Sequence, residues 1–248
     1  MSAAQEAGEG KDEDFFARRA AARARLDALD PAKNGENGAD PLRKDWFEAV
    51  YEDAAGDAAC VPWAHLAPHP LILSFAGLQL AGEREAFSGL RVLDVGCGLG
   101  DNAEFFASLG ARVCAFDFVA GAVEWARGRF PQSAVDYRVA DLFAPPPEWL
   151  GAFDLVNECY TLQALAPDLV PEALGALARV LRPGGAMLLV ARARDEGEAA
   201  ADPPWPLPPG VFAQAEAAGL EPAAIEDVAP AGALATRHWR ALLRRAPA

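Results

Sequence analysis

Apolar and polar positions follow two patterns along the chain, which change near residue 85. From Leu90 onward, short apolar runs alternate with segments of helical periodicity. The predicted strands are RVLDVG (91–96), RVCAFDF (112–118), VDYRVAD (135–141), FDLVNECY (153–160) and AMLLVA (186–191). Continuous apolar strands joined by helical crossovers are typical of a parallel sheet covered on both faces. The pattern therefore predicts an α/β core over residues 85–248, closed by two further strands near its end.

The first part of the chain carries helical periodicity instead. Residues 1–13 are small, polar and charged, and we expect them to be disordered because they have little apolar surface to bury. Helices are predicted over residues 14–29, 42–54 and 71–81, separated by loops rich in proline, glycine and asparagine. We therefore expect residues 14–84 to form a helical cap that precedes the core.

Composition and charge narrow the class of protein. The net charge of −14 argues against a nucleic-acid partner, because such proteins usually carry a basic stripe. No apolar run approaches the roughly 20 residues that span a bilayer, and the acidic start MSAAQEAGEGKDEDFF does not resemble a signal peptide. The 4 cysteines form no C-x-x-C pair. These features predict a cytoplasmic protein with reduced thiols that does not bind membranes.

The run RVLDVGCGLGD (91–101) is the main candidate for chemistry. It joins a strand to a helix, where glycines let the backbone approach a nucleotide-like ligand. Gly96, Gly98 and Gly100 have the spacing G-x-G-x-G. A dinucleotide fingerprint needs glycine at 101, where the chain has Asp101, and no Gly-Lys-Ser/Thr follows as in a phosphate-binding loop.

Charge beside this loop favours a cationic ligand. A helix N-terminus attracts anions, but Asp94 and Asp101 flank the loop and would repel a phosphate. S-adenosylmethionine fits these residues because it is a nucleoside with a sulfonium, an amino-acid tail and no phosphate. We therefore predict S-adenosyl-L-methionine as the cofactor.

Several motifs together resemble the class I S-adenosylmethionine-dependent methyltransferases, over roughly residues 85–245. LDVGCGLG resembles the first motif, and LRPGG precedes the fifth strand as in the family. The resemblance implies that Asp117, in AFDF with Phe118, binds the ribose hydroxyls. It also implies that Asp141, in VADLF, holds the adenine amino group beside Leu142. The implied fold is Rossmann-like, with a seven-stranded mostly parallel sheet, helices on both faces and an N-terminal helical cap.

The methyl acceptor must be selected outside these motifs. The segment WFEAVYEDAAGDAACVPWAHLAPHP (46–70) resembles the amino-terminal part of the thiopurine S-methyltransferase and tellurite-resistance branch. This second resemblance implies that Trp63, with Trp46, covers the cofactor, and that a thiol or related chalcogen is the acceptor. Alternatively, both tryptophans anchor the cap by packing. The compact cap favours a small-molecule acceptor over a polymer.

The segment NECYTLQAL follows the fourth predicted strand, where the transferred methyl group should lie. Glu158 and Tyr160 are candidate catalytic residues there, and Glu158 is also a candidate cofactor ligand or loop-ordering residue. A base is needed for a hydroxyl or ammonium acceptor, whereas a thiol needs little help. Trp205, in the proline-rich segment after the fifth strand, is a candidate lid residue.

Other functions remain open from the sequence alone. His65 and His69 lack a third histidine or a cysteine pair beside them, so we expect no metal site. The Asn/Asp-Pro-Pro-Tyr signature of nucleobase and glutamine methyltransferases is absent. A protein that binds S-adenosylmethionine or S-adenosylhomocysteine without turnover is the alternative to an enzyme. A dinucleotide-dependent oxidoreductase is disfavoured by Asp101.

Overall fold

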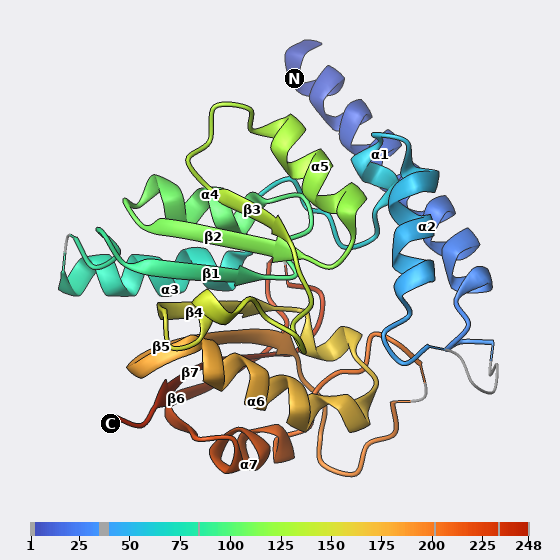
Figure 1. The fold of residues 1–248 in the computed structure, drawn as a ribbon. Coiled ribbons are helices and arrows are strands. Elements are labelled where there is room, and N and C mark those ends of the chain that lie inside the picture. The colour runs from blue at the N-terminus through green and yellow to red at the C-terminus, as the bar shows by residue number, and fades with distance from the viewer. Residues whose placement is uncertain (1–2, 35–39, 84, 201, 233, 248) are drawn as a thin grey trace. The chain divides into compact units, whose positions relative to one another are not determined.

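The computed structural model describes residues 3–34, 40–83, 85–200, 202–232 and 234–247 (Figure 1). The chain divides into two compact units, Met1–Leu66 and Ala67–Ala248. The sequence pattern placed the boundary between cap and core at 84/85 instead. The difference arises from helix α3 (Pro70–Gly82), which packs on the sheet of the second unit through Leu71, Ile72 and Phe75.

The first unit is built from helices α1 (Ala3–Leu29) and α2 (Lys44–Ala54) and the short 3-10 helix η1 (Ala58–Cys60). Helix α1 begins at Ala3, whereas the sequence predicted disorder up to residue 13. Alanine and glutamate, the commonest residues of the segment 3–13, both favour helix. Asp30, after α1, pairs with Arg43, before α2, at 2.6 Å with both side chains buried.

The second unit contains one seven-stranded sheet in the order β3-β2-β1-β4-β5-β7-β6. Its strands are β1 (Arg91–Val95), β2 (Arg112–Asp117), β3 (Asp136–Val139), β4 (Phe153–Cys159), β5 (Leu181–Arg192), β6 (Leu220–Val228) and β7 (His238–Arg245). Strands β1 to β5 pair in parallel, and β7 lies antiparallel between β5 and β6. The predicted Rossmann-like, mostly parallel sheet is thereby confirmed.

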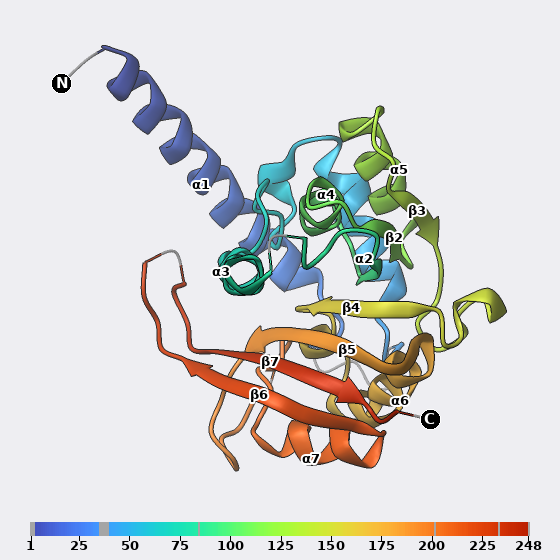
Figure 2. The same cartoon turned by 90° about the vertical axis from the view of Figure 1, so that its left-hand side faces the viewer.

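Helices cover both faces of this sheet (Figure 2). Their bounds are α4 (Asp101–Ser108), α5 (Ala120–Arg129), α6 (Val170–Val180) and α7 (Gly210–Ala217). Short 3-10 helices lie at Pro147–Trp149 (η2), Leu162–Ala164 (η3) and Pro167–Leu169 (η4). The buried residues of α3, α4 and α5 form one core cluster with the sheet, and those of α6 and α7 form the other. Successive strand residues such as Val92 and Leu93 face opposite clusters, as the pleat requires.

Helix α3 is held to the sheet by a buried guanidinium as well as by apolar contacts. Arg240 on β7 is 7% exposed and pairs with Glu226 on β6 at 2.5 Å. It also donates to the carbonyl of Leu71 in α3 at 3.3 Å. Arg240 is therefore part of the interior, although it belongs to a strand with four arginines or histidines among its eight residues, HWRALLRR.

Within the described residues, no helix combines the length and the apolar character needed to cross a bilayer.

We predict that Phe106→Ala in α4 lowers the free energy of unfolding of the second unit by about 3–5 kcal/mol, because it removes a fully buried ring and leaves a cavity. Phe105→Ala is the matched control, since its ring is only partly buried and its loss should be clearly smaller. Urea unfolding measures both. Equal losses would contradict the burial assigned to Phe106.

Candidate active site

The glycine run forms a tight loop at the end of β1, against the loop that follows β4. Gly96 has φ +59°, and a Cβ there would lie 2.5 Å from Thr161 Oγ1. Thr161 Oγ1 in turn donates to the Val95 carbonyl at 3.0 Å. At Gly100, φ is +87° and a Cβ would collide with the Tyr137 hydroxyl. Both positions therefore require glycine, and the loop approaches its neighbours too closely for any side chain.

Asp101 has a different role from the one its charge suggested. Its carboxylate makes a two-pronged ion pair with Arg129 of α5, at 2.8 and 3.0 Å. Arg129 also donates to the Leu99 carbonyl at 2.6 Å. The Asp101 charge is thus balanced within the protein and fixes the glycine loop. Asp101 therefore gives no reason to expect a cationic ligand, and only the other acidic groups of the site favour one.

Asp117, at the end of β2, also holds the glycine loop. Its oxygens accept from the Gly98 amide at 3.1 Å and the Val119 amide at 3.0 Å. Burial raises the pKa of this carboxyl to about 6, and the amide hydrogen bonds oppose the shift. A carboxylate has further lone pairs, so these two bonds leave it able to accept hydroxyl protons. Phe118, the next residue, is partly buried.

Asp94 is buried at the end of β1 and faces Asn157 of β4. The Asn157 amide donates to Asp94 Oδ1 at 2.7 Å, because the register of the two strands places these residues opposite each other. Burial raises the pKa of Asp94 to about 7, against the effect of this hydrogen bond. Asp94 therefore carries a charge that the protein itself compensates only in part.

Glu158, one residue further along β4, is fully buried. Its Oε1 accepts from the amides of Thr161 at 2.7 Å and Leu162 at 2.8 Å, which shapes the loop after the strand. Burial raises the pKa of Glu158 to about 7. This carboxyl therefore has a clear role in ordering the loop through one of its two oxygens.

Three buried oxygens at this edge of the sheet have no hydrogen-bond partner among the described residues. They are Asp94 Oδ2, Asn157 Oδ1 and Glu158 Oε2. Unpaired buried polar atoms are costly and rare, and all three of these accept rather than donate. Asp94 and Asn157 are neighbours on adjacent strands and Glu158 is the next residue of β4, and acceptors of this kind fit a ligand that brings N–H donors or a positive charge. An ammonium group meets both requirements.

Asp141 and Leu142 follow β3 at the same edge. Asp141 is exposed and its Oδ1 accepts from the Phe143 amide at 2.8 Å, which fixes the turn. Leu142 is buried in the core cluster of α6 and α7. The backbone joins this turn to the neighbouring strand, since the Ala140 amide donates to the Asp117 carbonyl at 3.1 Å.

Tyr160 lies just beyond β4 between two histidines. Nothing in the sequence indicated that these three residues are close together. The Tyr160 hydroxyl is 2.9 Å from His69 Nε2 and 2.5 Å from His238 Nε2. His69 precedes α3 and His238 begins β7, and both are buried. Tyr160 has φ +72°, which is uncommon for a residue with a side chain. No spacing rule relates residues so far apart, so only the fold could reveal this cluster.

The segments after β4 and β5 are tied to each other. Gln163 is buried, and its Oε1 accepts from the Arg192 amide at 2.6 Å. Its own carbonyl accepts from the Trp205 amide at 2.7 Å. Trp205 is thus held beside the loop that carries Tyr160, which agrees with its candidacy as part of an acceptor pocket.

Trp63 lies in the first unit, inside an aromatic cluster. Its Nε1 donates to the Tyr51 hydroxyl at 3.0 Å, and its ring centroid is 5.3 Å from that of Phe47 and 5.9 Å from that of Trp46. Trp46 Nε1 donates to the Leu26 carbonyl at 3.2 Å. These contacts account for both tryptophans as packing residues of the unit, and coverage of a cofactor by Trp63 stays a prediction.

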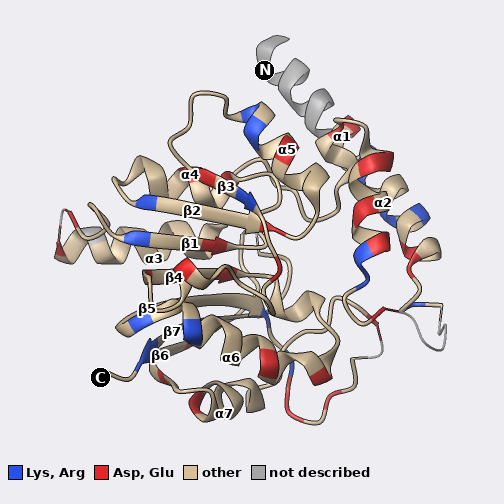
Figure 3. Ribbon diagram, in the orientation of Figure 1, with Lys and Arg blue, Asp and Glu red and all other residues tan. Residues whose placement is uncertain are grey.

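Figure 3 shows basic and acidic residues at both ends of the parallel strands. Asp94, Asp117 and Glu158 lie at or near the ends of β1, β2 and β4, whereas Arg192 ends β5. Among the described residues no histidine, cysteine or acidic cluster has the arrangement of a metal site, and all 4 cysteines are free thiols.

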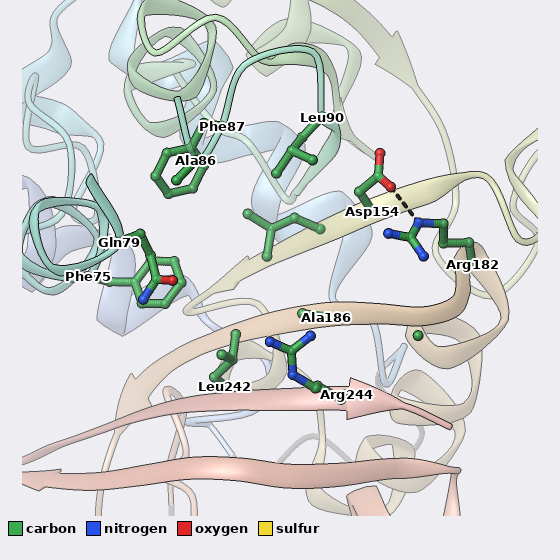
Figure 4. A pocket seen from close by; sticks show the side chains of 12 residues that line it. Phe75, Gln79, Ala86, Phe87, Leu90, Asp154, Arg182, Ala186, Leu242 and Arg244 are labelled. Atoms are coloured by element: carbon green, nitrogen blue, oxygen red, sulfur yellow. Dashed lines mark hydrogen bonds and ion pairs between the residues drawn. The ribbon is translucent and has the colours of Figure 1, made fainter. Parts of the chain in front are cut away.

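A cavity of about 190 Å³ lies near the opposite edge of the same sheet (Figure 4). Phe75, Phe87 and Leu242 contribute to its apolar lining. At its rim, Arg182 is paired with Asp154 at 2.5 Å. This cavity includes none of the residues at the glycine loop, so it is separate from the candidate site.

Comparison with known proteins agrees with the fold and with the position of the glycine loop. Residues 92–185 match the family model of a methyltransferase domain. The matched segment runs from β1 into β5 and includes the glycine loop, Asp117, Asp141 and Glu158. This match supports the resemblance to class I methyltransferases over the matched segment.

Relatives in sequence are aligned over just under half of the chain. The ubiquinone biosynthesis O-methyltransferase of Xanthomonas oryzae pv. oryzae (strain PXO99A) is 41% identical over 115 residues, which are 45% of this chain and 47% of that protein. The match thus spans about half the length of the relative. The comparisons do not support the thiopurine and tellurite-resistance branch, since this relative is an O-methyltransferase.

Solved structures share the methyltransferase fold over most of the chain. The 1,6-didemethyltoxoflavin-N1-methyltransferase of Burkholderia thailandensis, with bound S-adenosylhomocysteine, has a TM-score of 0.62 at 20% identity and covers 83% of this chain and 88% of its own. The [4+2]-cyclase SpnF has a TM-score of 0.55 at 20% identity and covers 65% and 76%. Proteins with different reactions share this fold, so function must be argued from the site.

The raised pKa values predict how the ligand-free protein responds to pH. Asp94, Asp117 and Glu158 bind protons more strongly when folded than when unfolded, where such carboxyls titrate near about 4. Their contribution to stability is therefore present at low pH and is lost as pH rises from about 4 to about 7. Thermal unfolding between pH 4.5 and 8 should show this decline.

Glu158→Gln should reduce the decline, because glutamine keeps an oxygen for the Thr161 and Leu162 amides without the buried charge. Glu172→Gln, on the exposed side of α6, is the control and should leave the profile unchanged. A Glu158→Gln profile as steep as that of the unmodified protein would contradict the assigned cost of this charge.

Proposed function

We propose that this chain is an S-adenosylmethionine-dependent methyltransferase that acts on a small molecule and transfers the methyl group to oxygen. The observation that carries the cofactor assignment is the set of unpaired buried oxygens on Asp94, Asn157 and Glu158 beside the glycine loop. They fit the ammonium end of S-adenosylmethionine, and phosphate-bearing cofactors would be repelled. The match of residues 92–185 to a methyltransferase domain supports the same assignment.

Each part of the carboxyl edge would bind one part of this cofactor. Gly96, Gly98 and Gly100 give the backbone close access, and Asp94 and Glu158 attract the amino-acid tail. Asp117 accepts from the ribose hydroxyls with the lone pairs that its two amide bonds leave. Asp141 and Leu142 hold the adenine, and Phe118 contacts it. When bound, the cofactor supplies an electrophilic methyl group, and the protein aligns the acceptor with it.

The contacts of Glu158 favour cofactor binding over proton abstraction. One of its oxygens is held by two loop amides, and the side chain is fully buried. A general base must reach the proton that it removes. Tyr160 is less buried, so it is the better candidate to contact an acceptor.

Oxygen is the acceptor atom that the sequence relatives favour, because those at about 40% identity are O-methyltransferases. The alignment covers only 47% of the relative, so the substrate itself is not transferred to this chain. The thiol or chalcogen acceptor, expected from the second resemblance, stays a prediction that the same experiment tests. A binding protein without turnover is the remaining alternative.

The test is a screen of the purified full chain with S-adenosylmethionine and a panel of phenols, thiols, amines and carboxylates. Mass spectrometry would follow S-adenosylhomocysteine and the methylated product. Methylated phenols would support the proposal, and methylated thiols alone would support the sulfur branch. Cofactor binding without product from any acceptor would favour the binding protein.

For the cofactor site, we predict that Asp94→Asn weakens S-adenosylmethionine binding by about 1–3 kcal/mol, because it removes a buried charge facing the ligand. Calorimetric titration measures the change. Asp136→Asn is the control, since Asp136 is exposed at the start of β3 and should leave affinity unaltered. Unchanged affinity in Asp94→Asn would exclude the role assigned to this carboxylate.

A further inference from the structure

The cavity of Figure 4 has mainly apolar walls, which come from α3, from the segment between α3 and β1, and from strands β4, β5 and β7. Phe75 and Phe87 are buried and form one wall, with ring centroids 6.3 Å apart and planes at 71°. Leu90, Ala186 and Leu242 pack against the core but stay partly exposed. Apolar surface is therefore left uncovered inside the cavity, and an apolar ligand of the right size would be stabilised by covering it.

Arg244 brings a positive charge to this apolar cavity. It lies on β7 opposite Ala186 of β5, on the same face of the sheet as Leu242. Figure 4 shows its guanidinium pointing into the cavity. No described residue forms an ion pair or hydrogen bond with this guanidinium, and that includes Glu221, which is opposite Arg244 on β6. Its N–H donors are thus available to a ligand.

The other two charged residues among the described lining neutralise each other. Arg182 Nε is 2.5 Å from Asp154 Oδ1, and Arg182 also donates to the Pro183 carbonyl at 3.1 Å. Since this pair has no net charge, Arg244 leaves the lining with one positive charge, in a chain whose net charge is −14. The lining therefore attracts an anion and repels a cation.

Size and polarity together limit the class of ligand. The cavity has a volume of about 190 Å³. A cavity of about 150 Å³ holds benzene, so this one fits a single ring with a short substituent. A free inorganic anion would find few hydrogen-bond donors beside the apolar walls, and a nucleotide is too large. A ring that carries one carboxylate uses both the walls and the guanidinium.

We propose that this cavity binds a small aromatic carboxylate. The ring packs against Phe75, Phe87 and Leu242, and the carboxylate accepts two parallel hydrogen bonds from Arg244, the geometry that guanidinium and carboxylate groups favour. The ligand enters from the side of Arg244 and Gln79, which are both exposed. None of the lining residues belongs to the glycine loop, so this second site does not rest on the proposed function.

The test is an NMR titration of the full chain, labelled at its leucine methyl groups, with phenylacetate and with phenylacetamide. The amide has nearly the same shape but no charge. Phenylacetate should shift the signals of Leu90, Leu155 and Leu242 saturably and leave that of Leu93, in the core cluster on the other face, unchanged. Phenylacetamide should bind about 10–100-fold more weakly, because it loses the charge-assisted contact with Arg244.

Arg244→Gln should weaken phenylacetate binding by about 10–100-fold and change phenylacetamide binding by less than about twofold. Arg112→Gln is the matched control, because Arg112 is an exposed arginine at the start of β2 outside the cavity. It should leave both affinities unaltered. Ala186→Leu fills the cavity and should weaken both ligands, and thermal unfolding checks that each variant is folded.

Equal affinities for the acid and the amide, or an unchanged phenylacetate affinity in Arg244→Gln, would overturn the recognition of a carboxylate. Shifts that do not saturate, or that occur only at the glycine loop, would overturn the site itself. Phenylacetate binding by a chain that transfers no methyl group would support this site and contradict only the proposed function. The two proposals can therefore fail separately.

Discussion

The parallel pairing of β1 with β4 is the constraint on which the site depends. It places Asp94 opposite Asn157 and Val95 opposite Glu158, inside the sheet, where water cannot reach them. Two carboxyls with unpaired oxygens are thereby buried on opposite faces of the sheet, and the structure tolerates their cost because core clusters cover both faces. Thr161 lies against Gly96, which leaves no space for a side chain at that position.

Much of the second unit could be predicted from the sequence, because its signals are local. Apolar runs predicted the strands and the glycine spacing predicted the loop, because both signals depend on residues that are close in sequence. Asp117 and Asp141 could be expected at one edge of the sheet because each comes at the end of a strand, and parallel strands end at the same edge. Asp101 was misassigned for the opposite reason. Its partner, Arg129, lies 28 residues away on another helix, and no pattern linked the two.

The acceptor side could not be predicted in the same way. His69, Tyr160 and His238 come from a helix start, a strand end and the last strand, and they meet only because β7 inserts beside β5. Their individual residue types gave no signal, since an isolated histidine is usually a structural residue. Arg240 was hidden similarly, because a basic final strand is typical of an exposed edge until α3 is known to cover it.

The position of β7 has a consequence for the order in which the protein is made. Strands β1 to β4, with the glycine loop and its carboxylates, leave the ribosome well before β7, which then enters between β5 and β6. Until that insertion, β5 and β6 each present an unpaired edge, and such edges readily join other chains. His238 and Arg240 arrive on this same strand. Nascent chains would therefore be most prone to aggregate in the interval when the glycine loop and its carboxylates are formed and β7 is not yet inserted.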